Sequence, residues 1–349
     1  MNRKNMLRWR RASLSLLSMA LLLWPMPIGA GLPQTGSVTL SGRATAVHAT
    51  ILGISTVISD TGSLPSSGSA QQASLLTATS PLPTSGGYLT VDVLHATTVG
   101  QGDASDSHAS AADLKVMVGG YNVAASLLVA QALAMCKGAG PTVSGYSQLV
   151  GLTINGGTIA VSGQPNQTIY LPNGRIVINE QQSSVSGNTA SITVRALHIY
   201  VNGLADVVIS YAQAGITCSN VPVCAGEEFD VGEGEDHDAS TGDREDWSFA
   251  GGTKDHSSWG HLEYIDHGPG GPTVHATRLT KFVRVSPTIR HIEGVANVNG
   301  VPGFIFALDT TDNHKLGLKS IFKLKLSNGY VGGNELDDGD IENEEPCDP

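Results

Sequence analysis

Polar and apolar residues alternate along most of the chain from Ser37 to Cys218. Within Ile192–Val201, the side chains of Ile192, Val194 and Ala196 would share one face of a strand, and the residues between them would share the other. A hydrophobic period of two is typical of β-strands. This part of the sequence is therefore predicted to form strands.

Asn-Gly pairs mark the turns between several of these strands. Such pairs occur at Asn155-Gly156, Asn173-Gly174 and Asn299-Gly300. Asn-Gly readily adopts the positive φ angles of a type I′ turn. We therefore expect tight hairpins at the first two pairs and a turn at the third.

Three segments of the first half need separate treatment. Tyr121–Cys136 is rich in Ala and Leu and would also suit a helix, but its alternation favours a long strand. Ser63–Ala73 and Gly100–Ala109 are rich in Gly, Ser and Asp, and are expected to be loops.

The second half starts differently and then returns to the strand pattern. Glu227–Asp246 is acidic and Gly-rich without clear periodicity, so it is expected to be a mobile loop. The segments expected to be strands after it are Gly260–His267, Thr273–Phe282, Ile289–Val298, Gly303–Asp309 and Ile321–Leu326. The fold class is therefore predicted to be all-β, with two consecutive antiparallel β-sandwich-like domains, at residues 37–218 and 224–347, behind a signal peptide.

The first thirty residues have the order of a secretory signal. A basic start containing Lys4 and Arg8 precedes the apolar stretch Leu14–Leu23, and small residues follow at Gly29-Ala30. The apolar stretch is about half of the ~20 residues that a membrane span needs. We expect residues 1–30 to be cleaved, leaving a secreted, extracellular or cell-surface protein without a transmembrane anchor.

Four cysteines lie behind this signal: Cys136, Cys218, Cys224 and Cys347. Outside the cytoplasm they can oxidise, and three pairings are possible. We favour Cys136–Cys218 and Cys224–Cys347, because each bond then closes one domain. No Cys-x-x-Cys motif is present, so structural disulfides are favoured over a metal site or a redox dithiol.

The charge pattern limits the possible partners. The formal net charge is −11, and acidic residues gather in Glu227–Asp246 and Glu335–Asp348. Nucleic acid is not an expected partner, because no basic track is present to neutralise phosphates. An extracellular or cell-wall carbohydrate, or another surface protein, remains as an expected partner.

Two groups of residues could bind metal ions, although no cofactor is firmly predicted. Zinc would need three or four converging ligands, and the weak candidates are His256, His261, His267 and His275. Calcium prefers oxygen ligands, and its candidates are Asp337, Asp338 and Asp340, which have the density but not the spacing of an EF-hand loop. Calcium is the more favoured ion, and ordinary polar strand and loop residues are the simpler interpretation of both groups.

No catalytic residue is predicted. The sequence has no Gly-x-Ser-x-Gly turn, and Glu180 and Asp206 are the carboxylates well inside the later strands of the first domain. Glu180 is expected to bridge strands. An enzyme is therefore less favoured than a binding or structural protein.

Several short motifs resemble known bacterial exported proteins. Motifs similar to choice-of-anchor P proteins are Gly42–Val47, Asp60–Pro65, Gln164–Thr168, Ile178–Gln181, Val194–Ile199 and Ile216–Cys218. Motifs similar to the post-choice-of-anchor-P domain, which often follows, are Gly260–His267, Ile292–Gly300 and Ser327–Tyr330.

The resemblance implies an exported or surface protein whose biochemical role is not established. Members of the family differ in their C-terminal attachment signals, and none is visible here, so release is favoured over display. We expect a non-enzymatic structural, adhesive or carbohydrate-contacting role. The alternatives are an extracellular metal-assisted hydrolase using the His256–His275 region, and a polymerising surface-layer or fibre subunit.

Overall fold

The computed structural model describes residues 38–82, 86–138, 140–219, 227–254 and 257–344. These residues form antiparallel β-strands and one short 3₁₀ helix, η1 (His314–Leu316), and contain no α-helix. The predicted all-β fold is confirmed. In the same ranges, no helix is long and apolar enough to span a membrane.

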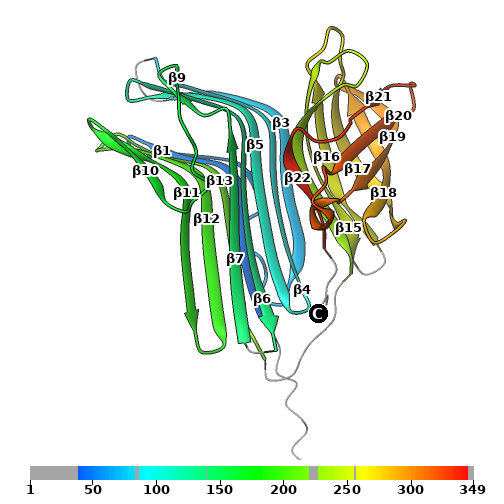
Figure 1. Ribbon diagram of the computed structural model, residues 1–349, viewed down its shortest axis with the longest axis horizontal. Helices are drawn as coiled ribbons and strands as arrows, with labels where there is room; N and C mark the ends of the chain where they lie inside the picture. Colours follow the sequence, from blue (N-terminus) through cyan, green and yellow to red (C-terminus); the bar gives the residue numbers. More distant parts are fainter. Residues whose placement is uncertain (1–37, 83–85, 139, 220–226, 255–256, 345–349) are drawn as a thin grey trace, which may run out of the picture. The chain divides into compact units, whose positions relative to one another are not determined.

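The strands form three sheets (Figure 1). The six-stranded sheet has the order β10-β11-β12-β13-β1-β2, with bounds β1 Thr39–Ile51, β2 Ile54–Asp60, β10 Gln167–Leu171, β11 Gly174–Ser186, β12 Thr189–Val201 and β13 Ala205–Thr217. The seven-stranded sheet has the order β3-β4-β5-β6-β8-β9, with β7 also paired to β6; its bounds are β3 Ser69–Pro81, β4 Tyr88–Gln101, β5 Ala104–Val118, β6 Tyr121–Lys137, β7 Gly140–Val150, β8 Thr153–Ile154 and β9 Gly157–Thr158.

The nine-stranded sheet contains the remaining strands in the order β21-β20-β19-β18-β17-β16-β15-β14-β22. Its bounds are β14 Phe229–His237, β15 Arg244–Lys254, β16 Ser257–Asp266, β17 Thr273–Arg284, β18 Ile289–Val298, β19 Val301–Thr311, β20 Ile321–Leu326, β21 Val331–Gly332 and β22 Asp338–Glu344. The three sheets belong to one compact unit. The domain boundaries 37–218 and 224–347 stay a prediction.

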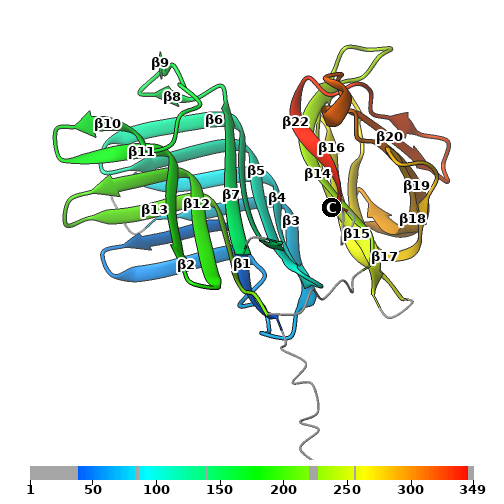
Figure 2. The same cartoon turned by 60° about the horizontal axis from the view of Figure 1, so that its bottom comes forward.

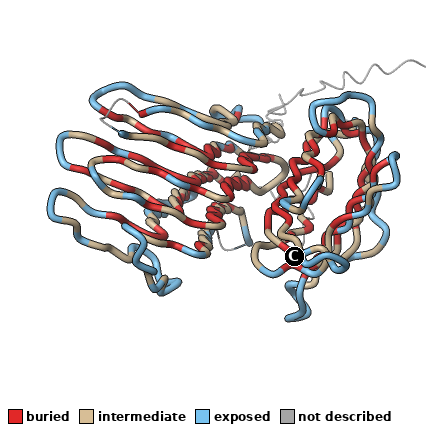
Figure 3. The backbone as a smooth tube through the Cα atoms, turned by 90° about the horizontal axis from the view of Figure 1, so that it is seen from above, coloured by how far each residue is buried: buried red, intermediate tan, exposed pale blue. Residues whose placement is uncertain are grey.

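The first core lies between the six-stranded and seven-stranded sheets, which form two layers in Figures 1 and 2. Small and aliphatic side chains fill it, among them Leu128 on β6 and Ile209 on β13. Polar groups inside it are bonded: the Ser210 hydroxyl donates to the Leu128 carbonyl at 3.1 Å. Burial along the strands and exposure at the turns (Figure 3) follow the alternation in the sequence.

A disulfide joins these two layers at one end. Cys136 is near the end of β6, Cys218 follows β13, and their Cα atoms are 5.6 Å apart, within the usual range. Cys224 and Cys347 lie outside the described residues. The covalent bond therefore connects one sheet to the other rather than two strands of the same sheet.

The second core lies inside the nine-stranded sheet and is aromatic. The rings of Trp247 and Phe322 stack with centroids 4.2 Å apart, and Tyr264 packs beside Phe322. The sheet curls around this core. As a result, the backbone N–H of Gly333, just after β21, reaches Glu245 on β15 and donates a hydrogen bond to it at 2.7 Å.

The predicted mobile loop at Glu227–Asp246 is wrong, because this segment contains β14 and the start of β15. β14 lies between β15 and β22, and both of its faces are covered: Val231 packs toward β4 while Asp230 points into the second core. A strand buried on both faces has no alternation of polar and apolar residues, so periodicity could not reveal it. The exposed turn is confined to the segment between β14 and β15.

The expected loop at Gly100–Ala109 is also wrong, since β4 ends at Gln101 and β5 begins at Ala104. At Ser63–Ala73 the strand β3 begins already at Ser69. Polar residues of β4 and β5 are buried between sheets, which explains why the composition of Gly100–Ala109 resembles that of a loop. The strand expected at Tyr121–Cys136 is confirmed as β6.

The Asn-Gly turns have two different geometries. Asn155-Gly156 and Asn299-Gly300 have positive φ at both residues, as a type I′ turn requires. At Asn173 the predicted hairpin is confirmed but the turn type is wrong, because Leu171 pairs with Gly174 and the loop is Pro172-Asn173. The proline ring fixes φ near −65°, which excludes type I′. A Cβ at Gly174 would lie 2.0 Å from the Tyr200 carbonyl oxygen, so close strand approach explains this glycine.

Removing the disulfide is expected to destabilise the first two sheets. The bond closes a sequence separation of 82 residues, so the double variant Cys136→Ser/Cys218→Ser should lose about 4–5 kcal/mol of unfolding free energy in the chain-entropy model. Urea unfolding of both proteins measures this difference. The substitution is preferable to a reductant, which would also act on other cysteines; an unchanged unfolding midpoint would contradict the expectation.

Candidate functional site

The strongest group of chemically active side chains lies on the outer face of β5. Along this strand Ser105 and Ser107 point toward the six-stranded sheet, where their hydroxyls donate to the carbonyls of Ser41 and Gln213. Asp106 and His108 lie between them in sequence and therefore point to the opposite side, toward the nine-stranded sheet. Both are buried, at 3% exposure each.

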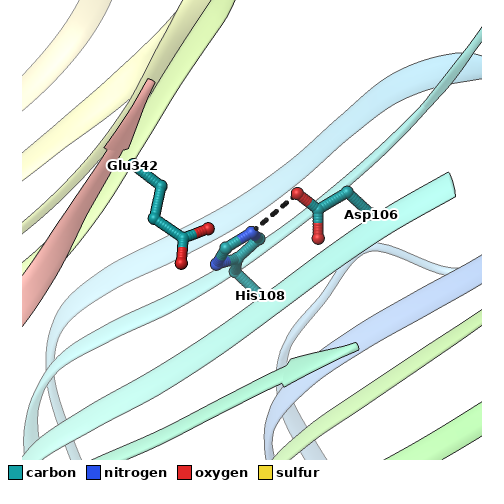
Figure 4. A group of neighbouring side chains, drawn as sticks. All are labelled: Asp106, His108 and Glu342. Atoms are coloured by element: carbon teal, nitrogen blue, oxygen red, sulfur yellow. Dashed lines mark ion pairs between the residues drawn. The ribbon is translucent and has the colours of Figure 1, made fainter. Parts of the chain in front are cut away.

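Glu342 on β22 completes this group, which we call the interlayer cluster: Asp106, His108 and Glu342 (Figure 4). One potential ligand atom from each residue lies within 4.8 Å of the other two. Nε2 of His108 is 3.0 Å from Oδ2 of Asp106. The amide of Gln131 on β6 donates to the Glu342 carboxylate and lies 3.5 Å from Nε2 of His108.

Glu233 on β14 adds a third carboxyl group to the surroundings of the cluster. It is buried, and its Oε2 atom has no hydrogen-bond partner among the described residues. The same holds for both carboxylate oxygens of Asp106, apart from the ionic contact with His108. Buried polar atoms without partners are rare in folded proteins.

The electrostatics follow from three carboxyl groups around one imidazole. Burial opposes the charge on His108, but the nearby Asp106, Glu342 and Glu233 outweigh it and raise its pKa to about 10. Burial raises the pKa of Glu233 and of Glu342 to about 8 each, against the opposing effect of His108. At neutral pH the imidazole of His108 is therefore charged, and burial favours the protonated forms of Glu233 and Glu342.

A second buried pair lies beside the cluster. Nδ1 of His95 on β4 is 2.5 Å from Nε2 of His261 on β16, and Nδ1 of His261 bonds to Gln72 on β3 at 2.9 Å. Burial, and then the repulsion of His261 and His108, hold the pKa of His95 well below its usual range. Burial, helped by His275, lowers the pKa of His261 to about 3. Both rings are therefore neutral at pH 7.

The zinc candidates from the sequence each have their own partners. His261 bonds to His95, while His267 pairs with Asp246 at 2.7 Å and His275 pairs with Glu263 at 2.6 Å. His256 lies outside the described residues. The described members of this set do not converge on one point.

The calcium candidates are also divided. Asp337 pairs with His237 at 2.7 Å and with Lys319 at 3.2 Å, whereas Asp338 accepts a hydrogen bond from Gln148. Asp337 and Asp340 line a pocket of about 150 Å³ together with Lys319, which already offers a positive charge there.

The sequence reasoning missed the interlayer cluster, although a signal for it was present. In the segment Asp338–Glu344 every second residue is acidic, which is the period of a strand with one acidic face. Asp106 and His108 have the same spacing of two. The composition of both segments is also typical of loops, and the sequence alone does not indicate which face of a strand packs against another sheet.

The comparisons with known proteins leave the family open. No protein-family profile matches the chain, and no curated protein matches it. Among solved structures, a putative AttH from Nitrosomonas europaea aligns over 88% of this chain and 93% of its own, at 8% identity and a TM-score of 0.19. A similarity this low supports no conclusion about fold or function.

The buried histidine pair predicts a specific pH dependence of stability. Because the folded-state pKa of His261 is depressed to about 3, the unfolded chain binds more protons, and stability falls as pH drops from about 6.5 toward 3. In His261→Gln the slope of unfolding free energy against pH, measured by urea unfolding between pH 4 and 5.5, should be smaller by about 1.4 kcal/mol per pH unit.

His291→Gln is the matched control. Hydrogen bonds first with Asp309 and then with Glu293 raise the pKa of His291, so its contribution is complete below about pH 6.5 and is lost only as pH rises through the folded-state pKa. The control should leave the slope between pH 4 and 5.5 unchanged. Equal slopes in wild type and His261→Gln would contradict the prediction.

Proposed function

We propose that this protein acts outside the cytoplasm as a non-enzymatic binding protein that contacts an extracellular polysaccharide. The compartment is supported by the Cys136–Cys218 disulfide, because such bonds persist in oxidising environments. An exported or surface location is also what the resemblance to choice-of-anchor P proteins implies. The observation that carries the proposal is the outer face of the six-stranded sheet.

This outer face has rows of aromatic and charged side chains that run across the strands. In one row Tyr170, Arg175 and Tyr200 are direct neighbours on β10, β11 and β12, followed by Asp206 on β13. Tyr170 is 84% exposed, and the guanidinium of Arg175 lies 5.1 Å from the centre of the Tyr200 ring. The rings are thereby held in place by neighbouring strands.

A parallel row crosses β12 at Arg195, five residues before Tyr200. Glu180 pairs with Arg195 at 3.1 Å, and Arg195 lies 5.6 Å from the centre of the Tyr211 ring. Between the rows, His198 contacts both Glu180 and Asp206, at 2.8 and 2.9 Å. The face therefore combines three tyrosines with both signs of charge.

This combination suits sugars. An aromatic ring offers a flat apolar surface to the C–H groups of a pyranose, and its hydroxyl offers a hydrogen bond. Guanidinium and carboxylate groups donate and accept strong hydrogen bonds with sugar hydroxyls. A flat open sheet fits an extended polymer better than it fits a small molecule, which needs a concave pocket.

The other roles predicted from the sequence have weaker support. The metal-assisted hydrolase would need His261 and His275 to be available, and in the structure each is bonded to another side chain. The polymerising subunit would need open strand edges, which β2 and β10 offer, but edges of this kind occur in many monomeric sheets. Neither has a particular observation in its favour.

The proposal predicts which tyrosines matter. Binding of the purified protein to a panel of bacterial and plant polysaccharides is measured on a glycan array and then by calorimetry. The affinity should fall at least tenfold in Tyr200→Ala and in Tyr211→Ala, because each variant loses a stacking ring that contributes about 1.4 kcal/mol or more to binding. Tyr146→Ala, on β7 of the other sheet and also exposed, is the control and should bind as the wild type does.

Two results would overturn the proposal. One is the absence of binding to any polysaccharide on the panel by folded wild-type protein. The other is equal loss of binding in Tyr146→Ala and Tyr200→Ala, which would place the contact elsewhere.

A further inference from the structure

We propose that Asp106, His108 and Glu342 bind a divalent transition-metal ion that holds the seven-stranded sheet to the nine-stranded sheet. This ion site is independent of the polysaccharide contact proposed above. It also differs from both metal sites expected from the sequence, because it includes none of their residues.

The geometry supplies a mixed set of ligands from two distant parts of the chain. Asp106 and His108 come from one face of β5, and Glu342 comes from β22. Their potential ligand atoms lie within 4.8 Å of one another. Ligands about 2.1 Å from a tetrahedral ion are roughly 3.4 Å apart. The rotatable side chain of Glu342 can make up the difference without moving either strand.

The partnerless carboxylate oxygens are the independent observation that points to a ligand. Oδ1 of Asp106 has no partner among the described residues, and its Oδ2 has only the contact with His108 at 3.0 Å. Oε2 of Glu233 has no partner there either. Both side chains are only 3% exposed. Removing a carboxylate from water without a partner is costly, and a cation would supply the missing interaction for several oxygens at once.

The donor atoms define the class of ion. An imidazole nitrogen with two carboxylates suits Zn²⁺ or Mn²⁺, whereas Ca²⁺ prefers a shell made of oxygen alone. Glu233 on the neighbouring strand β14 adds a further buried carboxyl group whose charge acts on His108, Glu342 and Asp106. Gln131, which bonds to Glu342, would fix the direction of that carboxylate.

The position of the site defines its role. It is buried between two sheets, and its ligands come from both, so the ion would act as a structural link rather than as a catalyst. Other polar contacts between these sheets, such as the hydrogen bond from Ser74 to Glu263 at 2.7 Å, are single bonds beside small apolar contacts. An ion bonded to three side chains would dominate them.

The test uses the full secreted chain, stripped with EDTA and dialysed. Calorimetry with Zn²⁺, Mn²⁺ and Ca²⁺ separately, followed by elemental analysis, should show one Zn²⁺ or Mn²⁺ per chain. Thermal unfolding should shift upward by about 5 °C at a metal concentration 100-fold above the dissociation constant. Asp106→Asn and Glu342→Gln keep the size of each side chain and should weaken binding at least 100-fold.

Asp309→Asn is the matched control. Asp309 also contacts a histidine, His291, which lies between two carboxylates, but on a partly exposed face of the nine-stranded sheet. This variant should bind the metal as the wild type does. Circular dichroism of all metal-free variants checks that they are folded, and Co²⁺ substitution, with its visible absorption bands, reports on the coordination in each.

Three outcomes would overturn the proposal: no binding of Zn²⁺ or Mn²⁺ by folded protein at micromolar concentration, binding of Ca²⁺ alone, and binding that survives both Asp106→Asn and Glu342→Gln. Failure here leaves the polysaccharide result untouched, because Tyr200 and Tyr211 lie on a different sheet.

Discussion

The burial of carboxyl groups between β-sheets is the constraint on which the rest of this structure depends. Asp230, Glu233 and Asp246 are each almost fully buried, and charged groups of this kind are seldom hidden from water without compensation. Two of them are compensated by direct contacts: Asp230 accepts a hydrogen bond from Thr310, and Asp246 pairs with His267 and Arg244. Around His108, by contrast, Oδ1 of Asp106 and Oε2 of Glu233 have no partner among the described residues.

The two faces of the seven-stranded sheet show how differently one sheet can be packed. The face toward the six-stranded sheet is apolar, with Leu128 and Leu114 in a continuous core. The opposite face contacts the nine-stranded sheet through small apolar groups, such as Val99 against Phe229, separated by polar side chains. Apolar contact alone gives little directional preference, so the polar groups fix how these two sheets meet.

The sequence was sufficient to predict the fold class, because polar and apolar residues alternate in every strand that has one face in an apolar core and the other in a polar environment. Ile192–Val201 and Tyr121–Cys136 were predicted correctly for that reason. The acidic strand β14 was not, because both of its faces are buried and its polar residues are neutralised by distant parts of the chain. For the same reason, the neighbourhood of His108 could not be predicted: Glu342 reaches it through sheet packing, which no local pattern encodes.

Because of the cystine near the ends of β6 and β13, the two layers of the sandwich are joined more firmly at one end than at the other. At that end the layers cannot separate or slide, whatever happens to the side chains between them. Opening must therefore start at the far end, where β6 begins at Tyr121 and β13 begins at Ala205. Amide protons there should exchange with solvent earlier than those beside the bond. Local opening of the two layers therefore has a preferred direction.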